Sequence, residues 1–208
     1  MRAGKRADHT HCLTQCKCHL APRYTACLRA GEGLVSIRAM VATRDDLFNR
    51  LDALGIVTKT VEHPTVFTVD EAKAARGDLA GSHSKNLFLK DKKGRIWLVV
   101  TLEDRAVDTK ALRKAIGAAQ LSFGKPELLK DVLGIDPGSV TPFAVINDTG
   151  GQVSVILDAG LLASEPLNFH PLVNTATTSI STEDLLAFLR DTGHEPVVLD
   201  FTDLTRET

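Results

Sequence analysis

The sequence predicts an α+β fold built on a mixed sheet. Pairs of strand-like runs are joined by short polar turns that contain glycine, as in antiparallel hairpins. Helical segments separate these pairs without the regular strand–helix alternation of a parallel α/β fold. The 208 residues are 43% hydrophobic and 25% charged, which excludes disorder, collagen and coiled coil as descriptions of the whole chain. No uncharged apolar run approaches about 18 residues, so we expect no membrane span.

Residues 1–39 differ from the rest of the chain in charge. They carry seven bases against two acids, whereas residues 40–208 carry 18 bases against 24 acids. All four cysteines lie in this leader, where the compressed Cys and His spacing fits no standard zinc finger, although a zinc site stays an alternative. The leader also lacks the apolar stretch of a secretory signal. We interpret residues 1–39 as a disordered tail or an upstream extension of the reading frame, and residues 40–208 as a single domain.

Local signals place the first elements of that domain. Thr43 and Asp46 form an approximate capping box, and a leucine repeat then predicts a helix that ends at Gly55. An extended piece over 57–62 leads to His63-Pro64, where the proline disfavours helix. Thr68 predicts the start of a second helix, which ends near Gly77.

The middle of the chain predicts a hairpin followed by two helices. Strands over 85–89 and 96–101 are joined by the polar loop 91–94. Asp108 caps one helix, and Pro126 lies in the first turn of another that ends at Gly134.

The last third predicts a second hairpin, with strands over 140–147 and 153–158 around a glycine turn. Further strands are expected over 167–169 and 175–180, where β-branched residues dominate the second. Ser181 and Asp184 open a helix that stops at Gly193, and 197–199 is a candidate closing strand.

Several catalytic signatures are absent from the sequence. It contains no GxSxG, HExxH, GxGxxG or P-loop lysine motif, and no cysteine after residue 27, so the domain has no cysteine nucleophile. Three segments remain as candidates. The first is Lys85-Asn86 at the start of a strand, where the cation could hold a phosphate and the amide could orient a hydroxyl or carbonyl. An ordinary surface lysine is its alternative reading.

The second segment runs from Gly138 through Thr141 to Pro142 and Phe143. A glycine-opened turn stiffened by proline can present backbone N–H groups to a developing oxyanion, although such a motif also occurs as a plain turn.

The third segment contains Asn168, Phe169 and His170 at a strand end. Its polar side chains could fix a ligand or a water molecule, and a structural histidine is the alternative. His63 is at most a residue that lines the pocket.

Three segments, taken in order, resemble the YbaK/ProX-type editing domains. They are Lys85-Asn86, the G-x-x-x-P-F sequence of residues 138–143 and the N-F-H-P sequence of residues 168–171. This family includes the editing domain inserted in bacterial prolyl-tRNA synthetases and free-standing Ala-tRNA(Pro) hydrolases, and the chain looks most like the latter. The resemblance runs from about Thr43 to Asp200. It implies a mixed, largely antiparallel sheet closed partly into a barrel with flanking helices.

The resemblance also implies ester hydrolysis without a metal or organic cofactor. Carried over to this chain, Lys85 matches the essential lysine, Asn86 its neighbouring amide and His170 the pocket histidine. Gly138 and Pro142 match the ends of the family's glycine-to-proline loop. Side chains that could line the small aminoacyl pocket form the remaining set: His63, Thr141, Phe143, Asn168, Phe169 and Val173. The leader is the one departure from the family pattern.

The implied substrate is alanine esterified to the acceptor end of tRNA(Pro), with prolyl-tRNA synthetase and translation factors as further candidate partners. Neither DNA nor a membrane is expected to bind, and the cytoplasm is the expected compartment. Because residues 40–208 are acidic overall, tRNA binding would depend on a local patch, for which the bases around the first hairpin loop are candidates. Two alternatives stay open: a deacylase of another ester such as Cys-tRNA(Pro), and a non-catalytic RNA-binding or regulatory module of the same fold.

Overall fold

A computed structural model describes residues 40–65 and 79–204. The chain separates into two units, Met1–Arg38 and Ala39–Thr208, and every described residue lies in the second. The interpretation of the leader and the helix expected from Thr68 fall outside the described residues.

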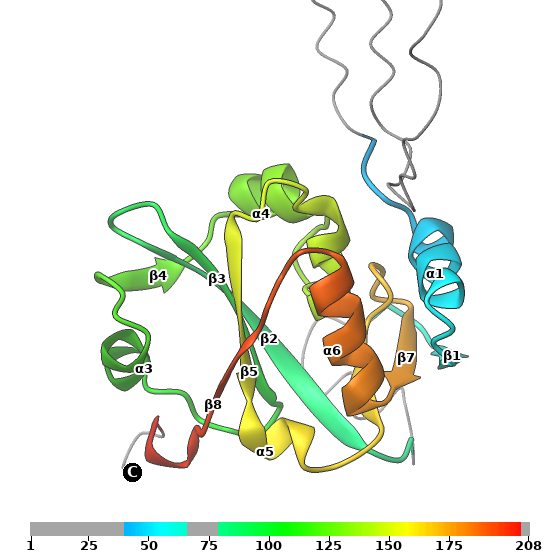
Figure 1. The fold of residues 1–208 in the computed structure, drawn as a ribbon. Helices are drawn as coiled ribbons and strands as arrows, with labels where there is room; N and C mark the ends of the chain where they lie inside the picture. Colours follow the sequence, from blue (N-terminus) through cyan, green and yellow to red (C-terminus); the bar gives the residue numbers. More distant parts are fainter. Residues whose placement is uncertain (1–39, 66–78, 205–208) are drawn as a thin grey trace, which may run out of the picture. The chain divides into compact units, whose positions relative to one another are not determined.

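The second unit is built on one mixed sheet of eight strands, in the order β1-β7-β6-β2-β3-β5-β8, with β4 paired to β2 (Figure 1). Four strand pairings are antiparallel and three are parallel. The strands are β1 Lys59–Glu62, β2 Ser82–Asp91, β3 Ile96–Leu102, β4 Leu121–Phe123, β5 Val153–Asp158, β6 Leu167–Phe169, β7 Ala176–Ile180 and β8 Val197–Leu199. The predicted α+β class with a mixed, largely antiparallel sheet is therefore confirmed.

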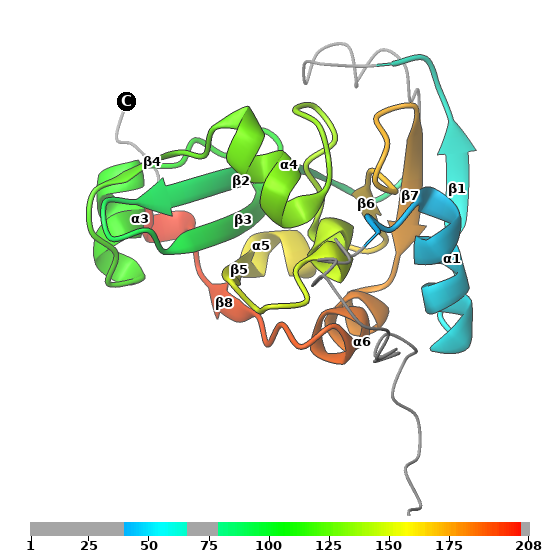
Figure 2. The ribbon, with the colours of Figure 1, turned by 90° about the horizontal axis from the view of Figure 1, so that it is seen from above.

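Helices and 3-10 turns cover both faces of this sheet, as the view from above makes clear (Figure 2). They are α1 Arg44–Ala53, α3 Thr109–Ala115, α4 Pro126–Leu133, α5 Ala159–Leu162, α6 Thr182–Asp191, and the 3-10 helices η1 Pro142–Asn147 and η2 Thr202–Leu204. The larger core packs α1, α4, η1, α5 and α6 against one face. A smaller core, with Leu112 of α3 and Phe201 before η2, lies against the other.

The caps read from the sequence set the ends of several helices. The Thr43 hydroxyl accepts a hydrogen bond from the Asp46 N–H, and the Asp46 carboxylate accepts one from the Thr43 N–H, which completes the capping box of α1. Ser181 caps α6 through the Asp184 N–H, and Pro126 occupies the first turn of α4. These helices begin where the sequence predicts.

The predicted second hairpin is wrong. Residues 142–147 form η1, because Pro142 fixes a helical φ and the Thr141 hydroxyl accepts a hydrogen bond from the Phe143 N–H. The β-branched side chains that favoured a strand there are packed into the larger core instead. β5 pairs in parallel with β3 and β8, so its partners come from distant parts of the chain.

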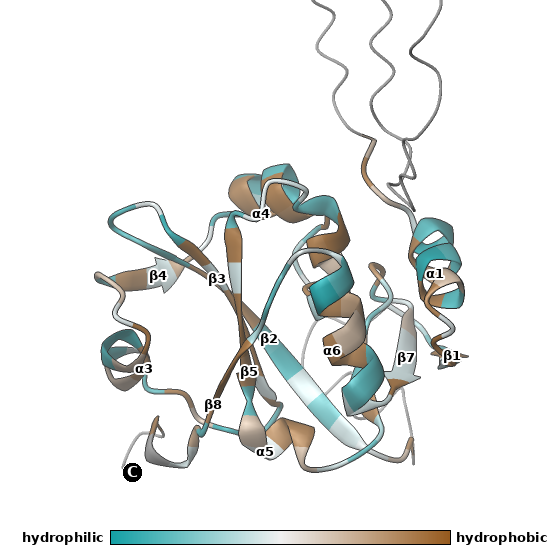
Figure 3. Cartoon of the chain, viewed as in Figure 1, coloured by the Kyte–Doolittle hydropathy of each residue, from teal (hydrophilic) through white to brown (hydrophobic). Residues whose placement is uncertain are grey.

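Strand composition differs across the sheet. β3 and β5 are largely hydrophobic along their length, whereas the first half of β2 is polar throughout (Figure 3). Because a strand covered by apolar cores on both faces reads as a continuous apolar run, β3 and β5 form the interior of the sheet. The polar half of β2 is therefore a candidate region for functional side chains.

Candidate active site

Lys85 and Asn86 lie on opposite faces of β2. The β2–β3 register is continuous from Ser84 to Lys90, so side chains alternate without a bulge. Phe88, two residues beyond Asn86, belongs to the larger core, whereas Leu89 belongs to the smaller one. The side chains of these two adjacent residues therefore point to opposite faces of the sheet.

Lys85 lies beside a row of polar groups that crosses three strands. Thr101 is directly opposite it on β3, and the Thr101 hydroxyl donates to the buried Asp158 carboxylate of β5 at 2.6 Å. Arg105 pairs with the same carboxylate at 2.8 Å. Burial lowers the pKa of Lys85, and the carboxylate of Asp104 opposes that shift. Partial desolvation strengthens the electrostatic attraction of Lys85 for an anion.

A cleft opens at the start of β2 and the end of β3. Gly81 at its edge has φ of 102°, and an added Cβ would lie 2.1 Å from the Pro166 carbonyl oxygen, so the two backbones approach closely there. The remaining residues around it mix acids, a base and a histidine: Ser82, His83, Leu102, Glu103, Asp104, Arg105 and Ser164. In this cleft, His83 lies two residues before Lys85 on β2. Leu102 directly follows Thr101, the β3 partner of Lys85.

The face that carries Lys85 continues onto β6 and β7 with buried polar side chains. Asn168 of β6 lies beside His83 of β2 and opposite Ser179 of β7. Ser179 donates to the Asn168 side-chain oxygen at 2.6 Å, and the Asn168 amide nitrogen donates to the Ala80 carbonyl at 3.0 Å. Asn168 is thus held rigidly and links the three strands.

His170 and His63 meet on this same face, their ring centroids 5.9 Å apart. Nδ1 of His170 lies 2.9 Å from the Ala176 carbonyl oxygen, and Nε2 of His63 lies 2.9 Å from the Thr177 hydroxyl. The turn after His170 includes Leu172 at φ of 65°, a conformation that L residues rarely adopt. Such strain concentrates at functional sites, and here it lies in the turn that directly follows His170.

On the opposite face, Asn86 holds the second predicted segment. Its side-chain nitrogen donates to the Val140 carbonyl at 2.9 Å. Its side-chain oxygen is buried and has no hydrogen-bond partner among the described residues. Because a buried unsatisfied acceptor is costly, this oxygen is available to a bound donor.

The loop held by Asn86 begins at Gly138, whose φ of 92° favours glycine. Within the loop, Ser139 donates its N–H to Asp136, and Phe143 and Ala144 donate theirs to Thr141. These internal bonds use neither the Gly138 N–H nor the Val140 N–H. Gly138 is exposed, whereas Thr141 and Pro142 are buried and fix the end of the loop.

The aromatic residues expected at the pocket lie in the larger core. Phe143 is fully buried and packs edge to face on Phe169, with ring centroids 5.8 Å apart, and on Phe188 at 5.5 Å. Val173 is half-buried in the turn after His170. Phe143 and Phe169 thus support the loop and β6 from the core side.

The stretch of β2 that carries Lys85 and Asn86 has a strand partner on one side only. On the edge of β2 away from β3, β6 pairs only with Ser82 and His83, and β4 pairs only with Leu89 to Asp91. No described strand pairs with this edge between Lys85 and Phe88. Lys85 faces one side of the sheet there, and Asn86 holds the Gly138 loop on the other.

Residues 40–65 and 79–204 contain no group of three or more His, Cys, Asp or Glu side chains placed to hold a metal ion. None of the helices in these ranges is long and apolar enough to cross a bilayer.

Comparison with known proteins identifies the family. The aminoacyl-tRNA editing domain matches residues 63–188, which include every predicted site residue. The chain belongs to this family. It is therefore an enzyme that deacylates aminoacyl-tRNA, by hydrolysis of the ester between amino acid and tRNA.

Two curated relatives support the assignment. Prolyl-tRNA synthetase associated domain-containing protein 1 of Bos taurus is 43% identical over 163 residues, 76% of this chain and 95% of the relative. The prolyl-tRNA editing protein ProX of Acetoanaerobium sticklandii is 36% identical over 146 residues, 70% of this chain and 89% of the relative. Both are matched over nearly their whole length by this chain.

A solved structure proposed to be a trans-editing enzyme for prolyl-tRNA synthetase shares the fold. Its TM-score is 0.56 with 24% identity, over 72% of this chain and 87% of that one. The family match and the two curated relatives confirm the family resemblance drawn from the three segments.

Sequence reasoning missed several groups of the polar face. His83 lies between Ser82 and Ser84 in β2, and Thr177 and Ser179 flank Thr178 in β7, so no alternation of apolar and polar residues marked them in the sequence. Asp158 and Arg105 come together only through the parallel pairing of β3 with β5, which no local signal predicts.

Proposed function

We propose that this editing domain hydrolyses alanine from mischarged Ala-tRNA(Pro), releasing alanine and free tRNA. The observation that supports the proposal is the stretch of β2 at residues 85–88, where Lys85 faces one side of the sheet and Asn86 holds the Gly138 loop on the other. The prolyl-tRNA names of the relatives support tRNA(Pro) as the RNA.

In the proposed reaction, water attacks the ester carbonyl carbon and the bond to the ribose oxygen breaks. Lys85 engages the phosphate or sugar of the terminal nucleotide and holds the ester in place. The N–H groups of Gly138 and Val140 stabilise the tetrahedral oxyanion. The departing ribose oxygen takes up the proton that the attacking water loses.

The neighbouring ribose hydroxyl assists this proton transfer, because no carboxylate among the three predicted segments is placed as a general base. The buried oxygen of Asn86 has no described partner and is a candidate acceptor for a ribose hydroxyl. An unchanged rate with a deoxy terminal ribose would rule out assistance by that hydroxyl.

Pocket size provides the specificity in this proposal. A synthetase pocket shaped for proline rejects the smaller alanine weakly, because each missing methylene is worth only about 1–3 kcal/mol. A second site too small for proline removes that error. His63, Asn168, His170 and Val173 line this second site, while Phe143 and Phe169 behind them keep it rigid.

The proposed partners are the acceptor end of tRNA(Pro) and, as a source of substrate, prolyl-tRNA synthetase or translation factors. The proposed compartment is the cytoplasm, where tRNA charging supplies the substrate.

Deacylation of Ala-, Cys- and Pro-tRNA(Pro) by the full chain tests the proposal. We expect rapid loss of alanine alone. Selective loss of cysteine would replace alanine with the alternative substrate. No hydrolysis of any of the three esters would instead favour a non-catalytic binding module.

A further inference from the structure

The hairpin tip between β2 and β3 carries a dense group of bases that the reaction at Lys85 does not use. Lys90, Lys92, Lys93 and Arg95 are all exposed. No ion pair joins the three lysines to a carboxylate of the described residues. This basic tip stands out because residues 40–208 carry more acids than bases.

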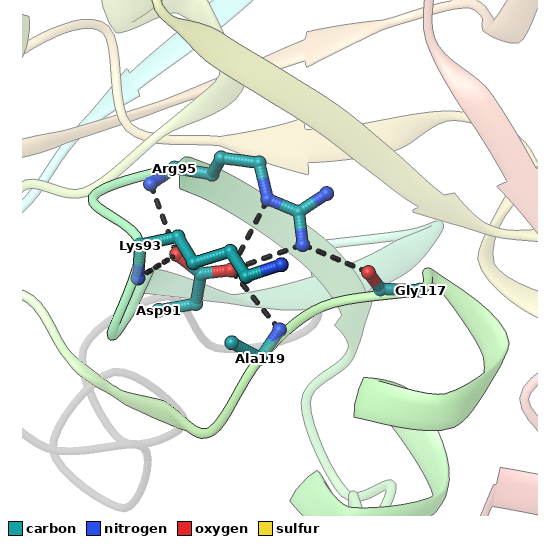
Figure 4. Close-up of polar contacts among 5 residues, drawn as sticks. All are labelled: Asp91, Lys93, Arg95, Gly117 and Ala119. Carbon is teal, nitrogen blue, oxygen red and sulfur yellow. Dashed lines mark hydrogen bonds and ion pairs between the residues drawn. The ribbon is translucent and has the colours of Figure 1, made fainter.

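The acid of the tip is turned inward and its charge is balanced there (Figure 4). Asp91 is 3% exposed. Its carboxylate accepts hydrogen bonds from the backbone N–H groups of Lys93, Arg95 and Ala119 at 2.8–3.0 Å. Arg95 also pairs with Asp91 through its guanidinium and donates to the Gly117 carbonyl.

This network makes the basic tip rigid. Burial alone would raise the pKa of Asp91, but the hydrogen bonds from Ala119, Arg95 and Lys93 together lower it, so the carboxylate stays charged. The Arg95 guanidinium also lies 5.0 Å above the Trp97 ring. The ammonium groups of Lys92 and Lys93 take no part in these contacts and are free to meet an external anion.

An exposed aromatic side chain lies at the same end of the sheet. Phe123 of β4 is 67% exposed and is paired with Leu89, so it lies on the face of β2 opposite the Lys90 side chain and close along the strand to the loop that carries Lys92 and Lys93. Exposed aromatics next to lysines are typical of surfaces that stack the bases of single-stranded nucleic acid while holding its backbone.

The distance from Lys85 fits a polyanion that also reaches the active site. A strand rises about 3.3 Å per residue, so Lys90 lies about 17 Å along β2 from Lys85. The tip cannot touch an aminoacyl ester held at Lys85. It can contact nucleotides that precede the terminal one.

We propose that Lys92 and Lys93 of the hairpin tip, together with Phe123, form the docking surface for the RNA backbone and bases behind the acceptor terminus. The inference rests on the proposed function for its choice of RNA. Asp91 is a positioning residue that holds the tip in shape.

Binding of uncharged tRNA(Pro), followed by fluorescence anisotropy, tests this surface independently of aminoacyl specificity. The test variant is Lys92→Gln/Lys93→Gln, which preserves the Lys93 backbone N–H bond to Asp91. The matched control is Lys59→Gln/Arg190→Gln, which removes two exposed charges on β1 and α6. Thermal melting of each variant confirms that it is folded.

We expect the test variant to lower the slope of log affinity against log salt by about 1.4–1.8, because each lost phosphate contact contributes about 0.7–0.9. Between about 50 and 200 mM salt, wild type then loses about tenfold more affinity than the test variant. The control keeps the wild-type slope. Phe123→Ser weakens binding without changing the slope, since stacking releases no counterions.

An unchanged slope in the test variant, or an equal change in the control, would overturn the docking surface. Unchanged affinity of Phe123→Ser would remove stacking from it. If wild type binds tRNA(Pro) through the tip yet hydrolyses no ester, the proposed function fails while the docking surface stands.

Discussion

The two ends of β2 use the same residue type for different purposes. At the start of the strand, Lys85 is partly buried beside Thr101 and near Asp104, and burial lowers its pKa. At the other end, Lys90, Lys92 and Lys93 are exposed around an inward-facing Asp91. A desolvated cation interacts strongly with one fixed anion, whereas exposed cations attract a long polyanion in a salt-dependent way. The difference in depth predicts chemistry at one end and binding at the other.

The largest effect is expected from Lys85→Ala. Loss of the cation should reduce the maximal rate of deacylation by about 100- to 1,000-fold, comparable to loss of one oxyanion donor. Lys59→Ala, which removes an exposed lysine of β1, is the control. Single-turnover deacylation measures both. A Lys85→Ala enzyme at full rate would remove this residue from the site.

Asn86→Ala sharpens the comparison at the same end of the strand. Without its hydrogen bond to Val140, the Gly138 loop loses its link to β2, and a misplacement of about 1 Å can cost up to about 100-fold in rate. We expect a 10- to 100-fold lower maximal rate. Asn86→Asp, which keeps the shape but not the amide donor, should be similarly slow. An unaffected rate in both variants would disconnect the loop from the reaction.

Asp91→Asn tests the other end of β2. The amide cannot accept all the N–H donors that converge on the carboxylate, so the hairpin tip should loosen and the melting temperature should fall. The substrate concentration for half-maximal rate should rise, while the maximal rate at Lys85 persists. Faster hydrogen exchange confined to residues 90–96 and 117–119 would report the loosening directly. A loss of maximal rate would show that the two ends are not separate.

The smallest effect is a shift in the pH profile. If the ammonium form of Lys85 is active, the rate is full below the pKa of Lys85 and falls as pH rises through it. Burial places that fall below the ordinary value of 10.5. Because the Asp104 carboxylate opposes the lowering, Asp104→Asn should move the fall to still lower pH. The profile is measured after subtraction of spontaneous ester hydrolysis, and an identical profile in the variant would contradict the coupling.

The sequence predicted what local chemistry determines. Capping at Thr43 and Ser181 and the turn before Gly94 act within a few residues, and those elements appear where expected. The strand predicted over 140–147 was wrong. The β-branched residues there favoured a strand, whereas Pro142 and the Thr141 cap favour the 3-10 helix that forms.

The site residues stay a prediction, and their arrangement did not follow from the sequence. Lys85 and Asn86 are adjacent in sequence, yet alternation places them on opposite faces of a stretch of β2 that has a strand partner on one side only. The extent of that stretch depends on where the short strands β4 and β6 end. Their lengths follow from long-range packing, which no local pattern encodes.

The most direct test asks whether the two ends of β2 have separate roles in catalysis and binding. It compares Lys85→Ala with Lys92→Gln/Lys93→Gln in single-turnover deacylation of Ala-tRNA(Pro) over a range of enzyme concentrations. We predict that the Lys85 variant loses maximal rate by a much larger factor than it raises the half-saturating concentration. The hairpin variant should need more enzyme for half saturation and retain the maximal rate. If the hairpin variant loses as much maximal rate as the Lys85 variant, the two ends of β2 do not have separate roles.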